Sequence, residues 1–137
     1  MGPDPVRLAD TRAWLTRVRN DISVAEIVLS VDPPQLEDAM FHCQQAVEKA
    51  FKAFLTWHDE PFRRTHDLAV VGAQCVGIDG SLQPLVDRAA PLSDFAWLFR
   101  YPGDQPAPSP EEATEALTLA REVVAAIHAR LPAETCP

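Results

Sequence analysis

The chain has 137 residues, of which 47% are hydrophobic, and a formal net charge of −8. This length and apolar content suffice for a buried core, so residues 1–137 are expected to form one domain. The acidic balance argues against extended, sequence-independent binding of duplex nucleic acid, which needs many lysines and arginines to neutralise phosphates. A compact site for a nucleotide or an RNA loop remains compatible with it.

The N-terminal sequence MGPDPVRLAD lacks the apolar core of a signal peptide, and no apolar run is long enough to span a membrane. The protein is therefore expected to be cytoplasmic. Cys43, Cys75 and Cys136 form no CxxC pair and leave one thiol unmatched, which disfavours a disulfide framework and a structural zinc site. Cys43 and Cys75 are expected to be small buried apolar residues.

The first expected helix runs from Pro5 to about Ser30, with Asp4 as its N-cap. Its apolar stripe consists of Leu8, Thr11, Trp14, Leu15, Val18, Ile22, Ala25 and Leu29. Four further apolar residues near the end of the helix lie outside this stripe: Val24, Ile27, Val28 and Val31. This second apolar face predicts contact with another subunit as well as with the core.

Asp32, Pro33 and Pro34 interrupt the pattern, and a second helix is expected from there to about Trp57. Its apolar stripe consists of Leu36, Met40, Cys43, Val47, Ala50, Phe51 and Phe54. The opposite side carries His42, Gln45, Lys49 and Lys52, with Gln44 and Glu48 at the boundary between the two faces. This polar side fits either a solvated surface or the wall of a polar groove.

After the connection HDEPFRRTHDL, Thr65 or Asp67 is expected to cap a third helix, which Gly77 and Gly80 would end. A fourth element is expected from Leu82 to Phe99. Pro91 can break this element, and Ser93 can cap a restart.

The segment RYPGDQPAPSP is expected to be extended, because Pro106, Pro108 and Pro110 forbid a regular helix or ladder. Ser109 and Glu112 then form a capping box that starts the last helix. The stripe of this helix consists of Ala113, Ala116, Leu117, Ala120, Val124, Ile127 and Leu131, with Pro132 as its stop. Since no segment alternates with period two, the sequence predicts an all-α bundle of four or five helices.

Three segments, in this order and at these distances, resemble the HEPN domain of prokaryotes: FHCQQAVEKAFKAFL at 41–55, RTHDL at 64–68 and FRYPG at 99–103. A Pro-rich loop and a Glu- and Ala-rich final helix complete the resemblance, which covers about Trp14 to Leu131. It implies an up-and-down helical bundle that is commonly a homodimer. Family members are often encoded beside a minimal nucleotidyltransferase in toxin–antitoxin or defence systems.

The resemblance also implies a candidate catalytic pair, because many HEPN domains are metal-independent ribonucleases in which four to six residues lie between an arginine and a histidine. Arg121 and His128, with six residues between them, match this motif. Seven residues are two helical turns, so both side chains point the same way. An imidazole can move a proton near neutral pH, and a guanidinium can stabilise charge on a phosphate. The competing interpretation is that His128, beside Arg130, faces the negative end of the helix dipole.

A second candidate site, for a nucleotide or RNA, consists of Gln45, Lys49, His66, Arg100 and Tyr101. Arg100 and Lys49 would grip a phosphate while Tyr101 stacks on a base. In the structural alternative, His66 closes its loop by hydrogen bonds and Arg100 pairs with a carboxylate such as Glu48.

Two functions from different classes remain open, and neither is expected to need a metal or a cofactor. The chain has no HExxH motif and no glycine-rich phosphate loop. The preferred prediction is a homodimeric module that partners a minimal nucleotidyltransferase and binds a nucleotide or single-stranded RNA. The alternative is a metal-independent endoribonuclease toxin that uses Arg121 and His128.

Overall fold

The computed structural model describes residues 2–96 and 106–137. Over these ranges the chain forms five α-helices and no strand: α1 Pro5–Ser30, α2 Leu36–Trp57, α3 Leu68–Ile78, α4 Gln83–Ala89 and α5 Pro110–Ala129. Three short 3₁₀ segments accompany them: η1 Gly80–Leu82, η2 Ala90–Phe95 and η3 Ala133–Thr135. The predicted all-α bundle is therefore confirmed.

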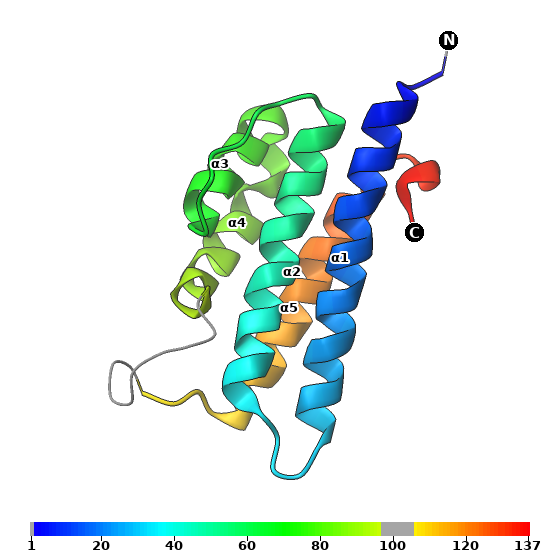
Figure 1. The fold of residues 1–137 in the computed structure, drawn as a ribbon. Helices are drawn as coiled ribbons and strands as arrows, with labels where there is room; N and C mark the ends of the chain where they lie inside the picture. Colours follow the sequence, from blue (N-terminus) through cyan, green and yellow to red (C-terminus); the bar gives the residue numbers. More distant parts are fainter. Residues whose placement is uncertain (1, 97–105) are drawn as a thin grey trace.

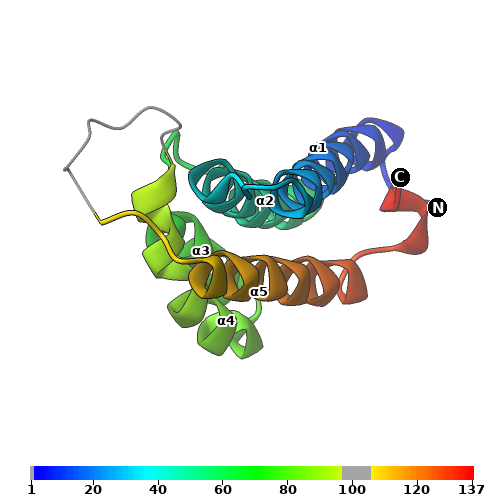
Figure 2. The same ribbon diagram turned by 90° about the horizontal axis from the view of Figure 1, so that it is seen from below.

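The two longest helices, α1 and α2, run antiparallel and pack against each other along most of their length (Figure 1). α5 packs against both of them, and α3 and α4 lie on the far side of α2 from α1. Seen from the end, α1 and α2 form the upper layer, with α4 and α5 below (Figure 2). After α5 the chain returns to α1, where η3 packs.

Three helices begin at the caps that the sequence predicts. Asp4 accepts a hydrogen bond from the backbone N–H of Val6, and Asp67 accepts one from Ala69. Ser109 and Glu112 form the complete capping box of α5. Of the two residues considered for α3, Asp67 is the cap, while Thr65 accepts a hydrogen bond from the backbone N–H of Asp67.

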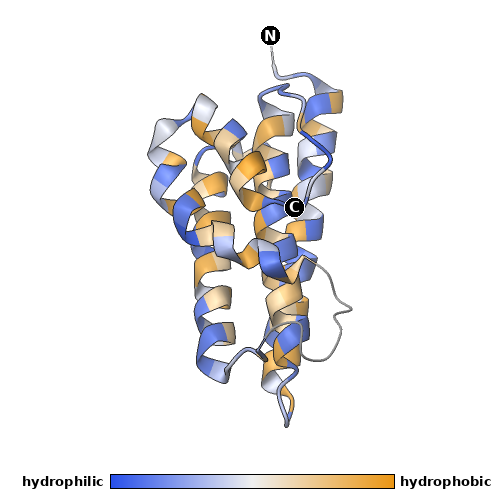
Figure 3. Cartoon of the chain, turned by 90° about the vertical axis from the view of Figure 1, so that its left-hand side faces the viewer, coloured by the Kyte–Doolittle hydropathy of each residue, from blue (hydrophilic) through white to orange (hydrophobic). Residues whose placement is uncertain are grey.

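The core lies where α2 meets α1, α3 and α5. Its largest fully buried apolar side chains are Phe51, Phe54, Leu15, Leu55, Leu68, Leu82 and Ile127. Apolar and hydrophilic residues alternate along the helices (Figure 3), as expected of helices that bury one face. From Met40 to Phe54, every residue of the predicted α2 stripe is buried, so this prediction is confirmed.

The region after α3 differs from the prediction. α3 continues to Ile78, so Gly77 lies inside its last turn rather than ending it. The fourth element is α4 followed by the 3₁₀ turns of η2, because Pro91 cannot donate the backbone hydrogen bond that an α-helix requires. Ser93 does not cap a restart: its Oγ accepts a hydrogen bond of 2.9 Å from the backbone N–H of Leu68, at the start of α3. The predicted residues up to Phe99 lie beyond the described range.

Candidate functional site

A buried aspartate on α1 holds two basic groups of α2. Asp21 is 7% exposed, and its Oδ1 lies 2.8 Å from Nδ1 of His42. Its Oδ2 accepts a hydrogen bond of 2.6 Å from Nζ of Lys49. His42 and Lys49 are seven residues apart, so two turns of α2 place both on the side that faces α1. In this Asp21 cluster the charge of Lys49 is neutralised within the protein.

A second buried carboxylate, Glu48 of α2, organises a larger polar cluster. Its Oε1 accepts a hydrogen bond of 3.1 Å from Nε2 of Gln44 and lies 2.9 Å from Nδ1 of His66. Its Oε2 accepts a hydrogen bond of 3.0 Å from Nζ of Lys52. Gln44 also donates to the backbone carbonyl of His66, at 3.2 Å. This Glu48 cluster therefore ties the loop before α3 to the middle of α2.

Aromatic rings cover the cation of the Glu48 cluster. Nζ of Lys52 lies 5.8 Å from the ring centroid of Trp14 and 5.4 Å from that of Phe62. These two rings contact each other edge to face, with their centroids 5.8 Å apart. Such a position suits a desolvated cation, because the ring faces carry partial negative charge.

The burial of these side chains corrects the sequence prediction for the polar side of α2. Gln44 and Glu48 do not lie at a boundary: they are 0% and 3% exposed. Lys52 is also buried, because Phe62, in the loop that follows α2, packs over it. The polar side of α2 is therefore mostly an internal hydrogen-bonded network rather than a solvated surface.

Glu48 is ionised at neutral pH in spite of its burial. Burial by itself raises the pKa of this carboxyl group, but hydrogen bonds from Lys52, His66 and Gln44 stabilise the carboxylate more strongly. The net pKa of Glu48 is therefore below its ordinary value of 4.5.

The predicted nucleotide-binding residues fall into different surroundings. Gln45 is partly buried and donates a hydrogen bond of 2.6 Å to Oε1 of Gln44, so it joins the Glu48 cluster. His66 belongs to the same cluster, with 46% of its side chain exposed. Lys49 belongs to the Asp21 cluster instead. Arg100 and Tyr101 lie outside the described residues, and so does the expected pairing of Arg100.

Sequence reasoning missed Asp21, although its position carried a signal. It comes three residues after Val18 and four before Ala25, both of which are buried in the stripe of α1. A carboxylate at that spacing faces the interior and needs a partner there. His42 and Lys49, which the prediction assigned to a polar face, are these partners.

The predicted catalytic pair lies on the edge of α5 that faces α1. Nη2 of Arg121 lies 2.9 Å from Oε1 of Glu26 on α1, and both side chains are about half exposed. His128 is partly buried and lines a separate cavity of about 290 Å³, together with Ile22 and Val124. Arg121 and His128 are seven residues apart, so about 10.5 Å of helix rise separates their Cα atoms. Within one chain they do not share a hydrogen bond.

Two of the three cysteines are buried, as predicted. Cys43 and Cys75 are both 0% exposed, and burial raises the pKa of each thiol to about 12. Both thiols are therefore protonated at neutral pH and act as small apolar groups. Cys136 is an exposed free thiol. No helix in the described ranges is long and apolar enough to cross a membrane.

These features define the class of the protein: a helical bundle with an internal polar network on its second helix and an arginine–histidine pair on its last. A family model of the HEPN domain matches residues 11–130. The chain belongs to the HEPN domain family. Comparison with curated proteins and with solved structures gave no match.

Proposed function

We propose that this HEPN protein is a homodimeric module that partners a minimal nucleotidyltransferase and holds a nucleotide or a single-stranded RNA, in a toxin–antitoxin or defence setting. The observation that carries the dimer is an exposed apolar edge on the C-terminal half of α1. Ile27 is 58% exposed and Val31, four residues later, is 42% exposed. Large aliphatic side chains at helical spacing, left in water, are suited to a second copy that covers them.

The apolar edge of α1 continues onto α5. Ile27 lines a shallow groove together with Leu117 and Arg121 of α5. A stable interface buries about 800 Å² on each partner, which is more than one helix edge supplies. In the proposed dimer, the groove would provide the additional surface, and the half-exposed Arg121 would lie beside the contact.

The nucleotide or RNA part of the proposal rests on the chain of hydrogen bonds that joins Gln45 to the loop of His66. Gln44 connects the two, since it accepts from Gln45 and donates to the His66 carbonyl. Lys49 would contribute through the Asp21 cluster rather than as an unpaired cation. Arg100 and Tyr101 supply the remaining phosphate and base contacts in this proposal.

The first prediction is that the wild-type protein has twice the 15.1 kDa chain mass at micromolar concentration, and that Ile27→Glu weakens this association. A charge placed at the centre of an apolar contact must be desolvated without a partner, so we expect the dissociation constant to rise at least about tenfold. Multi-angle light scattering over a concentration series measures the mass of the wild type and the dissociation constants of the two proteins.

Val6→Glu is the matched control, because Val6 is 66% exposed on the same helix but lies about 30 Å along it from Ile27. We expect this variant to keep the wild-type mass. A wild-type protein that elutes at one chain mass at all these concentrations would contradict the dimer. Co-expression with a minimal nucleotidyltransferase, if one is encoded beside this chain, followed by gel filtration, tests the proposed partner separately.

One observation favours an endoribonuclease as the second candidate function. Arg121 and His128 lie on the same edge of α5, and the ion pair that holds Arg121 is exposed. Exposed ion pairs contribute little stability, about 0–1 kcal/mol, so an RNA phosphate could displace Glu26 at small cost. His128 would then move the proton of a ribose hydroxyl, and Arg121 would stabilise the charge on the phosphate.

If the protein cleaves RNA, we expect His128→Ala to abolish cleavage in EDTA. Arg121→Lys should impair cleavage, because the lysine ammonium cannot form the paired hydrogen bonds that the planar guanidinium of arginine makes with a phosphate. Cleavage of a labelled single-stranded RNA, measured at several pH values between 5 and 8, tests this. Arg88→Lys is the control, because Arg88 forms an equally exposed ion pair with Glu122. Absence of cleavage at every pH would exclude the enzyme but not the binding module.

A further inference from the structure

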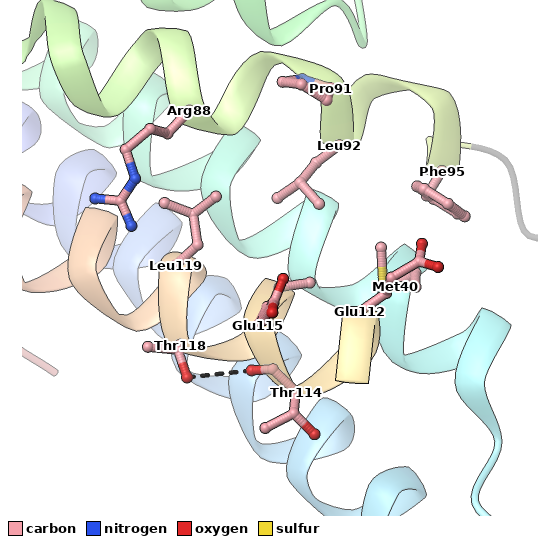
Figure 4. A pocket seen from close by; sticks show the side chains of 11 residues that line it. Met40, Arg88, Pro91, Leu92, Phe95, Glu112, Thr114, Glu115, Thr118 and Leu119 are labelled. Carbon is pink, nitrogen blue, oxygen red and sulfur yellow. Dashed lines mark hydrogen bonds between the residues drawn. The ribbon is translucent and has the colours of Figure 1, made fainter. Parts of the chain in front are cut away.

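A groove lies between α5 on one side and α4 and η2 on the other. It is on the opposite side of the bundle from the apolar edge of α1. Its volume is about 580 Å³. Leu92 and Phe95 of η2 face it from one side, and Leu119 of α5 faces it from the other (Figure 4). Met40 of α2 closes its inner end.

The apolar floor of this groove is fixed by the core. Met40 is 4% exposed and Leu92 is 6% exposed, so each presents only a small part of its surface to the groove. Leu119 and Phe95 are partly buried and pack against the same core. A ligand would therefore meet a preformed apolar surface and would not have to order it.

Carboxylates line the α5 side of the groove. Glu112 and Glu115 both extend toward it from α5 (Figure 4). Among the described residues that line the groove, Arg88 is the basic side chain, and it is neutralised by Glu122, whose Oε2 lies 2.7 Å from its Nη1. The described lining of the groove therefore carries a net negative charge, from Glu112 and Glu115.

The start of α5 explains one of these carboxylates but not the other. Glu112 belongs to the capping box, where it accepts a hydrogen bond from the backbone N–H of Ser109. Glu115 lies beyond the first turn, where the helix dipole no longer favours a negative charge appreciably. Among the described residues it has no hydrogen-bond or ion-pair partner. Its exposed carboxylate is therefore available to a cation of a ligand.

We propose that this groove binds an amphipathic, basic helix of a partner protein. Apolar side chains of that helix would contact Leu92, Phe95 and Leu119, while lysines or arginines beside them would pair with Glu112 and Glu115. Between Glu112 and Leu119 the α5 wall rises about 10.5 Å, so about two turns of a bound helix would lie against it. The negative charge disfavours a nucleic acid or a phosphorylated ligand at this site. The inference rests on the proposed function only in assuming a protein partner.

The test uses three synthetic probes: a 14-residue helix of leucine and lysine, its leucine and glutamate counterpart, and an oligolysine of the same charge. Fluorescence anisotropy at physiological salt measures their binding to the full chain. We expect only the helix of leucine and lysine to bind. Glu115→Lys should weaken that binding roughly tenfold, because it replaces a carboxylate at the groove by an ammonium group that repels the lysines of the probe.

Glu134→Lys is the matched control, because it makes the same change in net charge at an exposed position in η3, outside the groove. We expect it to bind the helix like the wild type. Equal weakening in both variants, equal binding of oligolysine, or no binding to the wild type would each overturn the inference. A dimer that binds no probe would overturn this inference alone, whereas a monomer that binds the helix would overturn only the dimer.

Discussion

Glu48→Gln is expected to lower the free energy of unfolding by about 3–5 kcal/mol, the usual cost of removing one partner from a buried ion pair. Glutamine keeps the shape of glutamate but carries no charge, so Lys52 would stay buried without a counterion. The new amide would also present donors where Gln44 and Lys52 already donate. Urea unfolding followed by circular dichroism measures the change.

The same carboxylate makes stability depend on pH. Because the pKa of Glu48 is lower in the folded protein than its ordinary value of 4.5, the ionised group stabilises the fold above that value. This contribution should disappear as the pH falls below 4.5 through the depressed pKa. Glu48→Gln lacks the ionisable group, so its free energy of unfolding should not show this decrease. The free energies of unfolding of the two proteins should therefore converge at low pH.

Glu37→Gln is the control for this prediction, since Glu37 is an exposed acid in the first turn of the same helix. We expect it to change the free energy of unfolding by less than about 1 kcal/mol. If Glu48→Gln had an equally small effect, Lys52 would have to be hydrated in the folded protein, contrary to its 9% exposure.

Gly72→Ala is expected to destabilise the protein by about 1–3 kcal/mol, although alanine ordinarily favours a helix over glycine. A Cβ at this position would lie 2.5 Å from Cγ1 and 3.0 Å from Cγ2 of Val86 on α4. The Cβ of Val86 is itself only 3.3 Å away, so rotating the valine side chain does not clear the contact. α4 must move away from α3 instead.

Gly77→Ala is the matched control in the same helix, because no atom lies within 4 Å of its added Cβ. It should stabilise the protein by about 0.4–1 kcal/mol. The double variant with Val86→Ala should recover part of the stability lost in Gly72→Ala, because the clashing methyl groups are gone. Similar melting temperatures for Gly72→Ala and Gly77→Ala would show that the helices are not in close contact.

Features that depend on a few neighbouring residues could be predicted from the sequence. The cap at Asp4 and the capping box at Ser109 are each completed within three residues, and both are present. The apolar stripe of α2 also follows from helix geometry alone. The family followed in the same way, because its motifs are short runs whose order and spacing are visible in the chain.

Features that depend on distant parts of the chain could not be predicted. Helix spacing alone places Glu48 at the boundary of two faces and Lys52 on the polar face. Both are buried by distant residues: Trp14 of α1 covers Lys52, and so does the loop containing Phe62 and His66, 10 to 18 residues away. The partners of Asp21 are 21 and 28 residues away. For Arg121, the spacing to His128 is visible in the sequence, whereas the ion pair with Glu26 on another helix is not.

The hydrogen bond from the backbone of Leu68 to Ser93 connects two surfaces that are separate in space. Ser93 belongs to η2, the wall of the groove beside α5, and Leu68 follows directly on the loop that carries His66. Any change in the position of η2 would therefore act on the first turn of α3 and, through it, on the position of His66. One hydrogen bond therefore links the wall of the groove to the loop that completes the Glu48 cluster.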